Sequence, residues 1–376
     1  MKNDQPPHLA DGSGSLCKTI LFESRQGGYF CYRIPGLEFT GPHTLLATCE
    51  GRKNDPWDTG HVDILLRRSV DGGMTWSPSS VLVDGESKTA HNAVLIGNPQ
   101  TSEVHFLYGR DYQRCFYCVS RDAGLSFSQP TEITTVFEQY RAEYPWMMIA
   151  TGSGHGIRLR SGRLLVPVWF SSTRNQKPTM VSIIYSDDNG NQWNRGPIIV
   201  RDGDGQGLDN PMEAVVVELQ DGRVMMNVRN ASPGQCRAVT SSPDGVHQWS
   251  PFRFDPQLRE PFCMASIRRV AQQPPDSQNL IVWANPDCIT TSGKPVTDEF
   301  GNADRKNLTV RLSRDEGWIW SHARVLEPGW SAYSDLAVSP DRTIYCHYEC
   351  GCHNNQMWDV KSLCLARFTP EWVGYL

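Results

Sequence analysis

A short turn sequence that recurs along the chain constrains its fold more than any other feature. The pattern is Ser-x-Asp-x-Gly-x-x-aromatic, and its intact copies stand at residues 69–76, 120–127, 186–193 and 313–320. A damaged copy at 242–249 has lost the glycine spacing. In such a turn the aspartate can bond backbone N–H groups, the glycine takes a positive φ and the aromatic side chain packs beneath. Each copy therefore predicts a hairpin turn with a structural task.

Runs typical of β-strands precede the intact copies, at residues 62–67, 116–119, 181–185 and 308–312. Recurrence of such a unit indicates a radial or solenoid array of sheets, and a β-propeller arranges four-stranded sheets around a channel. No stretch shows convincing helical periodicity. The 376 residues suit six blades of roughly sixty residues each. We expect an all-β, six-bladed β-propeller, with residues 1–18 as an N-terminal extension and 19–376 as a single propeller domain.

The composition is that of an ordinary globular protein. It is 39% hydrophobic and 20% charged, and no apolar run approaches the length needed to span a membrane. The formal net charge is −5 and there is no basic stripe, which argues against nucleic-acid binding. The N-terminus, Met1-Lys-Asn-Asp-Gln-Pro-Pro-His8, has no charged region followed by an apolar stretch, so we expect no signal peptide and a cytoplasmic protein.

The twelve cysteines are spread from Cys17 to Cys364 without a disulfide-like spacing. We expect them to be free thiols, mostly in the core, which suits a reducing compartment. One cluster could suggest a zinc site: Cys346, His347, Cys350, Cys352 and His353. It lacks a second paired half at zinc-site spacing, so no metal is expected.

A tyrosine near the C-terminus and three upstream arginines carry the candidate chemistry. Tyr333 stands in a strand-like stretch with Glu349 shortly after it, and Arg33, Arg229 and Arg305 lie in strand-like contexts. One nucleophilic phenol with three guanidiniums suits a substrate that bears its own carboxylate next to the reacting carbon. A carboxylate nucleophile would be repelled by such a substrate, whereas a neutral phenol is not.

Four features in this order resemble the sialidase (exo-α-neuraminidase) family, whose members attack with a tyrosine. They are Tyr32-Arg-Ile-Pro35, Glu50-Gly-Arg52, the recurrent turns (called Asp boxes in that family) and Tyr333-Ser-Asp335, and the match runs from about residue 29 to residue 350. The resemblance implies a six-bladed propeller with its pocket over the central channel. It also implies an enzyme that needs no metal and no organic cofactor.

The resemblance assigns the arginines to the carboxylate of a sialic acid. Arg33 and Arg229 match the first and second arginines of the family's triad. Arg305 has the family's offset from the following strand and Asp box, and Arg311 is the alternative third member. Arginine suits this task because its planar donors bind a carboxylate in bidentate fashion and stay charged. Glu349 resembles the carboxylate that holds the first arginine in place.

Glu213 resembles the base that takes the phenol proton from Tyr333. A phenol has a reference pKa of about 10, and a nearby base with surrounding positive charge is expected to correct its poor nucleophilicity. The chain departs from the family here, because Ala-Val follows Glu213 where Cys-Gln or Pro-Gln is common. Glu218 is a competing carboxylate, although strand alternation should point it to the opposite face.

The general acid/base is expected in the polar loop that follows Glu50. Asp58 aligns best with the family, judged by its distance to the pair Arg67-Arg68 ahead of the first Asp box. Asp55 is the alternative, although the proline that follows it is more typical of a turn. His61 stands where the family often has an acidic residue. Arg52 is a candidate contact for the sugar hydroxyl groups. Trp146 is a candidate for the N-acyl pocket, with a buried core position as the alternative.

The sequence thus predicts a retaining exo-α-sialidase that hydrolyses terminal sialic acids of glycoproteins, gangliosides or oligosaccharides through a tyrosyl-enzyme. The alternative enzymes are a glycosidase for the related acidic sugar Kdn and a trans-sialidase. A non-catalytic Asp-box propeller that binds a protein or glycan is the alternative from a different class. That alternative predicts scattered loss of the arginines, the tyrosine and the glutamate, all of which are present. Linkage preference, N-acyl preference and oligomeric state stay open.

Overall fold

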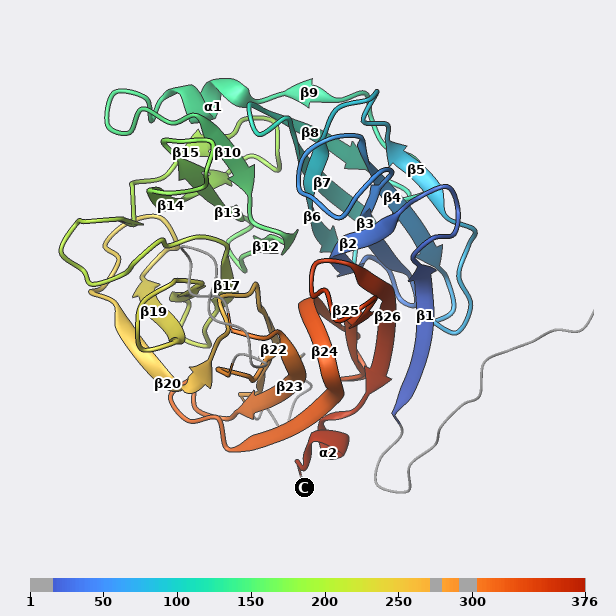
Figure 1. The fold of residues 1–376 in the computed structure, drawn as a ribbon. Coiled ribbons are helices and arrows are strands. Elements are labelled where there is room, and N and C mark those ends of the chain that lie inside the picture. The colour runs from blue at the N-terminus through green and yellow to red at the C-terminus, as the bar shows by residue number, and fades with distance from the viewer. Residues whose placement is uncertain (1–15, 271–278, 291–302, 376) are drawn as a thin grey trace, which may run out of the picture.

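Strands radiate in six blades around a central axis, as Figure 1 shows in a view along that axis. The computed structural model describes residues 16–270, 279–290 and 303–375. Within these ranges strands dominate, and the two short helices lie at the edge of the ring. The predicted all-β, six-bladed propeller is confirmed.

Each blade is a four-stranded antiparallel sheet, and the blades follow one another in chain order. The first blade consists of β2 (Cys31–Phe39), β3 (Leu45–Arg52), β4 (Val62–Ser69) and β5 (Ser80–Val83). The second consists of β6 (Ala90–Asn98), β7 (Glu103–Arg110), β8 (Arg114–Ser120) and β9 (Thr131–Glu132). The third consists of β10 (Met148–Thr151), β13 (Leu164–Ser171), β14 (Thr179–Ser186) and β15 (Asn194–Arg195). The fourth consists of β17 (Ala214–Glu218), β18 (Val224–Val228), β19 (Cys236–Ser242) and β20 (Arg253–Arg259). Short additions are β11 (Gly154–His155), β12 (Ile157–Arg158) and β16 (Val200–Arg201).

The last two blades share one long strand. The fifth contains β21 (Ser266–Arg269), β22 (Ile281–Pro286), β23 (Lys306–Ser313) and the first part of β24 (His322–Val338); the sixth contains the second part of β24, β25 (Ile344–Cys352), β26 (Val360–Phe368) and β1 (Cys17–Glu23). Because β24 pairs with β23 and then with β25, the two blades form one seven-stranded sheet. The helices are α1 (Thr134–Glu138) and α2 (Pro370–Val373).

The two ends of the chain close the ring. β1 pairs antiparallel with β26, from Cys17 opposite Arg367 to Glu23 opposite Ser362, and Figure 1 shows the blue N-terminal strand beside the red C-terminal one. The strand begins at Cys17, slightly ahead of the expected start of the domain at residue 19. Residues 1–15 of the predicted extension lie outside the described ranges.

The hydrophobic core lies between the blades. Central strands are apolar on both faces because a blade packs against a neighbour on each side, and every residue of β3 is buried. Within the described residues, six hydrophobic clusters each join two neighbouring blades. Leu46 of the first blade, for example, packs with Leu95 and Phe106 of the second.

The recurrent turns connect the third and fourth strands of the first five blades. In the first turn, Ser69 Oγ donates to Asp71 Oδ1 at 2.8 Å, and the N–H of Gly73, with φ of 78°, donates to Ser69 Oγ at 2.9 Å. The damaged copy keeps this chemistry, since the N–H of Gly245 donates to Ser242 Oγ at 3.0 Å. The sixth blade has no such connection because its third and fourth strands, β26 and β1, come from opposite ends of the chain.

A buried aspartate ties the innermost strands together at the axis. Asp335 Oδ2 accepts from the Leu37 N–H of the first blade at 2.8 Å, and Oδ1 accepts from Ser266 Oγ of the fifth at 2.9 Å. Asp335 Oδ1 also lies 2.5 Å from His155 Nδ1 of β11. Tyr333 is two residues away on the same strand, so this hub fixes the backbone that carries it.

All twelve cysteines are free thiols, and most are buried, as expected. Cys346 and His347 are neighbours on β25, so their side chains point to opposite faces of the blade. His347 Nδ1 lies 3.2 Å from the Gly36 carbonyl oxygen. No helix in the described part of the chain is long and apolar enough to cross a membrane.

Candidate active site

A pocket of about 430 Å³ lies at one end of the central axis. Arg33 lies near the start of β2, Glu213 immediately precedes β17, and Tyr333 opens the second part of β24. Arg229 immediately follows β18, and Glu349 lies near the end of β25. First strands start, and second strands end, at the same end of an antiparallel blade. Residues far apart in sequence therefore meet there.

The centre of the pocket is a hydrogen-bonded group of Tyr333, Glu213 and Arg229. The Tyr333 hydroxyl donates to Glu213 Oε1 at 2.6 Å, and Arg229 Nη1 donates to the Tyr333 oxygen at 2.6 Å. Arg229 also forms an ion pair with Glu213. The tyrosine is only 6% exposed. The expected nucleophile and the expected base are thus within hydrogen-bond distance, as a nucleophile–base pair requires.

Burial raises the pKa of the Tyr333 phenol well above its usual value, and this outweighs the lowering by the Arg229 guanidinium. Desolvation penalises the phenolate more than Arg229 and Arg305 favour it, and the negative charge of Glu213 raises the pKa further. The expected help of a base and positive charge to the nucleophile therefore stays a prediction for the reacting complex. Tyr333 is a neutral phenol that donates its proton to a carboxylate.

The three predicted arginines surround the Tyr333 ring. Their guanidinium carbons lie 5.6 Å (Arg33), 6.0 Å (Arg229) and 5.3 Å (Arg305) from the ring centroid, and all three line the pocket. Arg311, the alternative to Arg305, pairs with Asp287 at 2.6 Å and does not line the pocket. The structure therefore brings Arg305, and not Arg311, to the other two.

Two of these arginines keep buried donors without a partner. Arg229 Nε and Arg305 Nε are buried donors that find no hydrogen-bond acceptor among the described residues. Arg305 otherwise donates to the Phe262 carbonyl at 2.8 Å. Buried donors are nearly always paired in native structures, so unpaired ones in a cavity indicate a place for an anionic group of a ligand.

Glu349 connects the first arginine to the tyrosine strand. Its Oε1 accepts from Arg33 Nε at 3.0 Å and from the Ile34 N–H at 3.1 Å, and its Oε2 accepts from the Tyr333 N–H at 3.3 Å. A β-bulge follows Arg33, and Ile34 has φ of 54°. A positive φ is strained for a β-branched residue. Glu349 thus holds a strained bulge that aims Arg33 into the pocket.

Asp58 lines the pocket from the loop of residues 53–61, between β3 and β4. Its Oδ1 lies 2.8 Å from Arg52 Nη2, and its side chain is 45% exposed. Withdrawal from water raises the pKa of Asp58, but Arg52 and then Arg33 outweigh this and leave it below the usual value. Asp55, the alternative acid, accepts the Trp57 N–H at 3.0 Å in a turn and does not line the pocket.

Arg52 also lines the pocket, but its donors are engaged within the protein. Nε and Nη2 donate to Glu50 Oε2 at 3.2 and 2.8 Å, and Nη1 donates to the Pro56 carbonyl. Glu50 in turn accepts the Asn92 N–H of the second blade at 3.0 Å. In this arrangement Arg52 orients Asp58, and its expected contact with sugar hydroxyl groups stays a prediction.

Trp146 does not reach the pocket, so its assignment to an N-acyl pocket is corrected. The indole is 2% exposed in the cluster between the second and third blades, and its N–H donates to the Phe137 carbonyl at 3.0 Å. Trp146 is therefore a core residue, which was the alternative interpretation. Glu218 also lies away from the pocket, at the other end of β17 from Glu213, where it pairs with Arg160 at 3.1 Å.

Sequence reasoning missed an aromatic and polar lining that comes mostly from loops. These residues are Trp57, Asn92, Tyr112, Trp169, Arg174, Asn175, Gln176, Met212, Phe262 and Trp358. Trp358, between β25 and β26, lies over Arg305 at 4.6 Å and over Arg33 at 5.6 Å. The available signal was a tryptophan in the polar segment 353–359, although no spacing rule links that segment to the arginines.

The fold and the pocket together define a class: six-bladed propellers built on Asp-box turns, with a cationic, tyrosine-containing pocket at one end of the channel. A family model described as a BNR repeat-like domain matches residues 43–346. The chain therefore belongs to the BNR repeat-like family, and the resemblance to sialidases read from its motifs is confirmed.

Similar sequences carry the name sialidase. A sialidase of Micromonospora viridifaciens is 30% identical over 92% of this chain and 53% of its own length, and one of Bacteroides fragilis is 30% identical over 85% and 60%. The chain thus spans about half to three fifths of these relatives. Sialidase-3 of Mus musculus is 27% identical over 90% of this chain and 91% of its own length.

Solved structures share the fold. The Hadza microbial sialidase Hz136 superposes with a TM-score of 0.76 at 22% identity, over 95% of this chain and 69% of its own. An intramolecular trans-sialidase from Ruminococcus gnavus gives 0.74 at 17% identity, over 96% and 98%. At such identities these likenesses support the propeller fold alone.

Proposed function

We propose that this protein is a retaining exo-α-sialidase that releases terminal sialic acids from glycans through a tyrosyl-enzyme. The observation that carries the proposal is the hydrogen-bonded pair of Tyr333 and Glu213 with three arginine guanidiniums around the tyrosine ring. The sialidase names of the sequence relatives support the same activity. A non-catalytic binding propeller would have no use for a buried nucleophile–base pair.

Substrate binding follows from the cationic floor of the pocket. The sialic acid carboxylate accepts hydrogen bonds from Arg33, Arg229 and Arg305, shared between its two oxygens, and so offers a partner to the unpaired donors of the last two. Binding of one carboxylate by three arginines places the adjacent anomeric carbon over the tyrosine. Such positioning replaces a bimolecular encounter by a step between neighbours.

In the first chemical step the Tyr333 oxygen attacks the anomeric carbon while the glycosidic C–O bond breaks. Because burial keeps the phenol neutral, its proton passes to Glu213 as the new bond forms, along the existing 2.6 Å hydrogen bond. Asp58 gives its proton to the leaving oxygen. The products of this step are the covalent sialyl-enzyme and the released glycan.

In the second step water attacks the sialyl-enzyme from the side that the glycan has left. Asp58, now a carboxylate, takes the proton of that water, and Glu213 returns a proton to the Tyr333 oxygen as the bond to the sugar breaks. The two displacements restore the starting configuration, as expected of a retaining enzyme. Transfer to a sugar hydroxyl in place of water would make the protein a trans-sialidase.

A fluorogenic aryl sialoside assay with product identification tests the proposal. We expect release of free sialic acid, with the α-anomer detected first by NMR. A fluorinated sialoside should add the mass of one sialic acid analogue to the peptide that contains Tyr333. Absence of turnover on sialosides and on the matching Kdn glycosides would contradict the proposal. A sugar product other than the free acid would favour transfer.

A further inference from the structure

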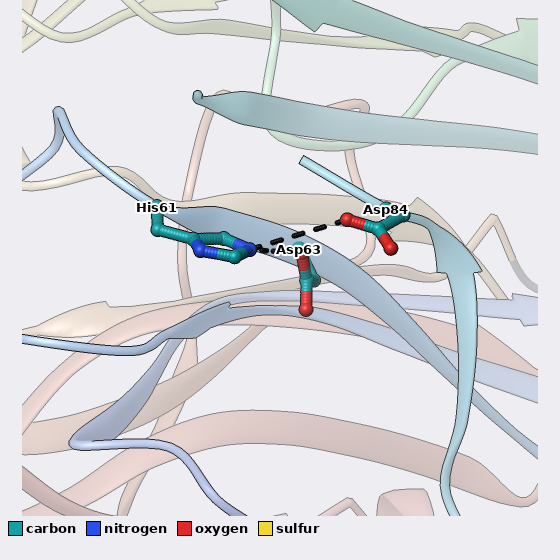
Figure 2. Close-up of side chains that lie close together, drawn as sticks. All are labelled: His61, Asp63 and Asp84. Carbon is teal, nitrogen blue, oxygen red and sulfur yellow. Dashed lines mark ion pairs between the residues drawn. The ribbon is translucent and has the colours of Figure 1, made fainter. Parts of the chain in front are cut away.

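Three side chains, those of His61, Asp63 and Asp84, lie close together, as Figure 2 shows. His61 Nε2 lies 3.3 Å from Asp63 Oδ1 and 4.0 Å from Asp84 Oδ1. Their potential ligand atoms all lie within 4.8 Å of one another. A histidine with two carboxylates is a donor set that binds divalent metals, so the occupancy of each donor atom decides what the cluster does.

The oxygens of Asp63 are already engaged within the protein. The Tyr29 hydroxyl donates to Oδ2 at 2.6 Å, and the Gly85 N–H donates to Oδ1 at 2.8 Å. The Lys53 ammonium lies 3.1 Å from Oδ2. A metal ion would displace these partners and stand next to a positive charge. The chemistry of the cluster therefore favours an internal ion pair over a metal site.

Two of the groups around Asp63 come from the ends of the acid-bearing loop, residues 53–61. Lys53, the first residue after β3, forms an ion pair with Asp63. His61, the last residue before β4, places Nε2 3.3 Å from Asp63 Oδ1 without a hydrogen bond, so this contact becomes an ion pair when the ring is protonated. The Lys53 N–H also donates to the His61 carbonyl at 3.0 Å and closes the base of the loop. Asp63 itself lies in β4 with a side chain that is 1% exposed.

The rest of the loop is held by Thr89 and Arg52. Thr89 Oγ1 accepts the Gly60 N–H and donates to the Gly60 carbonyl, both at 3.0 Å, next to the fastened end. Toward the tip, Arg52 donates to the Pro56 carbonyl and pairs with Asp58, whose side chain stays 45% exposed. The position of Asp58 thus depends on how firmly the two ends of the loop are fastened.

We propose that Asp63 is a positioning residue that clamps the base of the 53–61 loop, through its ion pair with Lys53 and its close contact with His61, and so holds the Asp58 carboxyl over the leaving group. This inference rests on the proposed sialidase function. Asp63 lies outside the pocket lining and touches no substrate. Catalytic groups have to be held within about 0.5 Å of their productive geometry. A clamp on a strand would give the loop that accuracy.

Leaving-group chemistry separates this role from a merely structural one. An alkyl sialoside, such as a sialylated sugar, needs proton donation to its leaving oxygen, whereas an aryl sialoside with an acidic phenol needs little. General acid catalysis contributes about 10²- to 10⁴-fold. Partial misplacement of Asp58 therefore slows alkyl substrates selectively. General damage to the propeller would slow both kinds equally.

The experiment measures kcat/KM of the full chain on a sialylated disaccharide and on a nitrophenyl sialoside, for wild type and variants. For Asp63→Asn we expect a loss of about tenfold or more on the disaccharide and less than about threefold on the aryl substrate. Lys53→Met should show a smaller selective loss. Its side chain is 33% exposed, so this variant keeps the test open if Asp63→Asn does not fold.

Matched controls separate the alternatives. Asp71→Asn makes the same change in the Asp box of the same blade, far from the loop, and should leave the ratio of the two rates unchanged. Asp84→Asn should do the same, because that carboxylate is 66% exposed and 4.0 Å from His61. A metal site would instead make Asp84→Asn resemble Asp63→Asn and would make the ratio sensitive to EDTA.

Equal losses on both substrates for Asp63→Asn and Lys53→Met would overturn the clamp. So would a selective loss that persists in an Asp58→Ala background, because Asp63 would then act independently of the acid. If the wild-type chain turns over neither sialoside, it is the proposed sialidase function that fails, together with the role that rests on it. The two failures are therefore distinguishable.

Discussion

The two sides of the pocket are built in different ways. The floor consists of Arg33, Glu213, Arg229, Tyr333 and Glu349. These residues lie in strands or directly beside them, are buried and are held by several ion pairs and hydrogen bonds. The acid side, residues 53–61, is a loop whose Asp58 is 45% exposed and has one ion pair. The floor therefore has one geometry in the free protein, whereas the acid side depends on how its loop is fastened.

The largest effect is expected on the floor, from Tyr333→Phe. Removal of the phenol oxygen deletes the nucleophile, so we expect kcat to fall by about 10³-fold or more on aryl and alkyl sialosides alike. Steady-state kinetics on both substrates check this. A variant with near-wild-type hydrolysis would contradict the nucleophile assignment.

Glu213→Gln extends the same test to the base. Since Tyr333 and Glu213 act as one unit, the double variant should be little worse than Tyr333→Phe alone. Additive losses would show that Glu213 has a separate task. Circular dichroism and thermal unfolding of each variant control for loss of the fold, because removal of one partner leaves Arg229 with an unpaired buried charge.

On the acid side, Asp58→Ala is expected to discriminate between substrates. Loss of proton donation should cost about 10²- to 10⁴-fold on an alkyl sialoside and far less on an aryl sialoside. Asp55→Ala is the matched control and should leave this ratio unchanged, because Asp55 does not line the pocket. An equal effect of Asp58→Ala on both substrates would remove Asp58 from the role of acid.

Arg305→Lys compares a floor residue with its sequence alternative. Lysine keeps the charge but loses the planar fork of donors, so kcat/KM should fall by about ten- to hundredfold through weaker carboxylate binding. Arg311→Lys should leave the kinetics unchanged, because Arg311 pairs with Asp287 away from the pocket. The opposite ranking of the two variants would reassign the third arginine.

The same contrast decides what the sequence could predict. The floor was predictable because its residues stand in or directly beside strands and follow the order of the family's motifs along the chain. Glu218 is removed by its place at the other end of β17 from Glu213. The third arginine was left between Arg305 and Arg311, because a β-bulge in β23 breaks the alternation between them. The blade count followed from repeated turns, although the pairing of β1 with β26 joins residues too distant for any local pattern.

The loops were harder to predict for physical reasons. Trp146 looked like a pocket residue because tryptophan suits either a core or a sugar site, and only packing on Phe137 and Phe170 decides for the core. Trp358 and Trp57 reach the pocket through loops without periodicity. The shift in the pKa of Tyr333 depends on the balance between burial and three charges. No residue pattern expresses that balance.

The smallest effect expected is a difference between two pH profiles on an alkyl sialoside. Arg52 and Arg33 hold the pKa of Asp58 below its usual value in the free protein, although burial alone would raise it. The bound substrate carboxylate adds a negative charge beside Arg33 and Arg305, so it should raise the pKa of Asp58. The acid has to be protonated for the first step, so activity is lost as pH rises through that pKa.

The alkaline limb of kcat, which reports the complex, should therefore lie at higher pH than that of kcat/KM, which reports the free enzyme. Coinciding limbs would show that the bound carboxylate does not change the pKa of Asp58, and limbs that persist in Asp58→Ala would show that another group sets them.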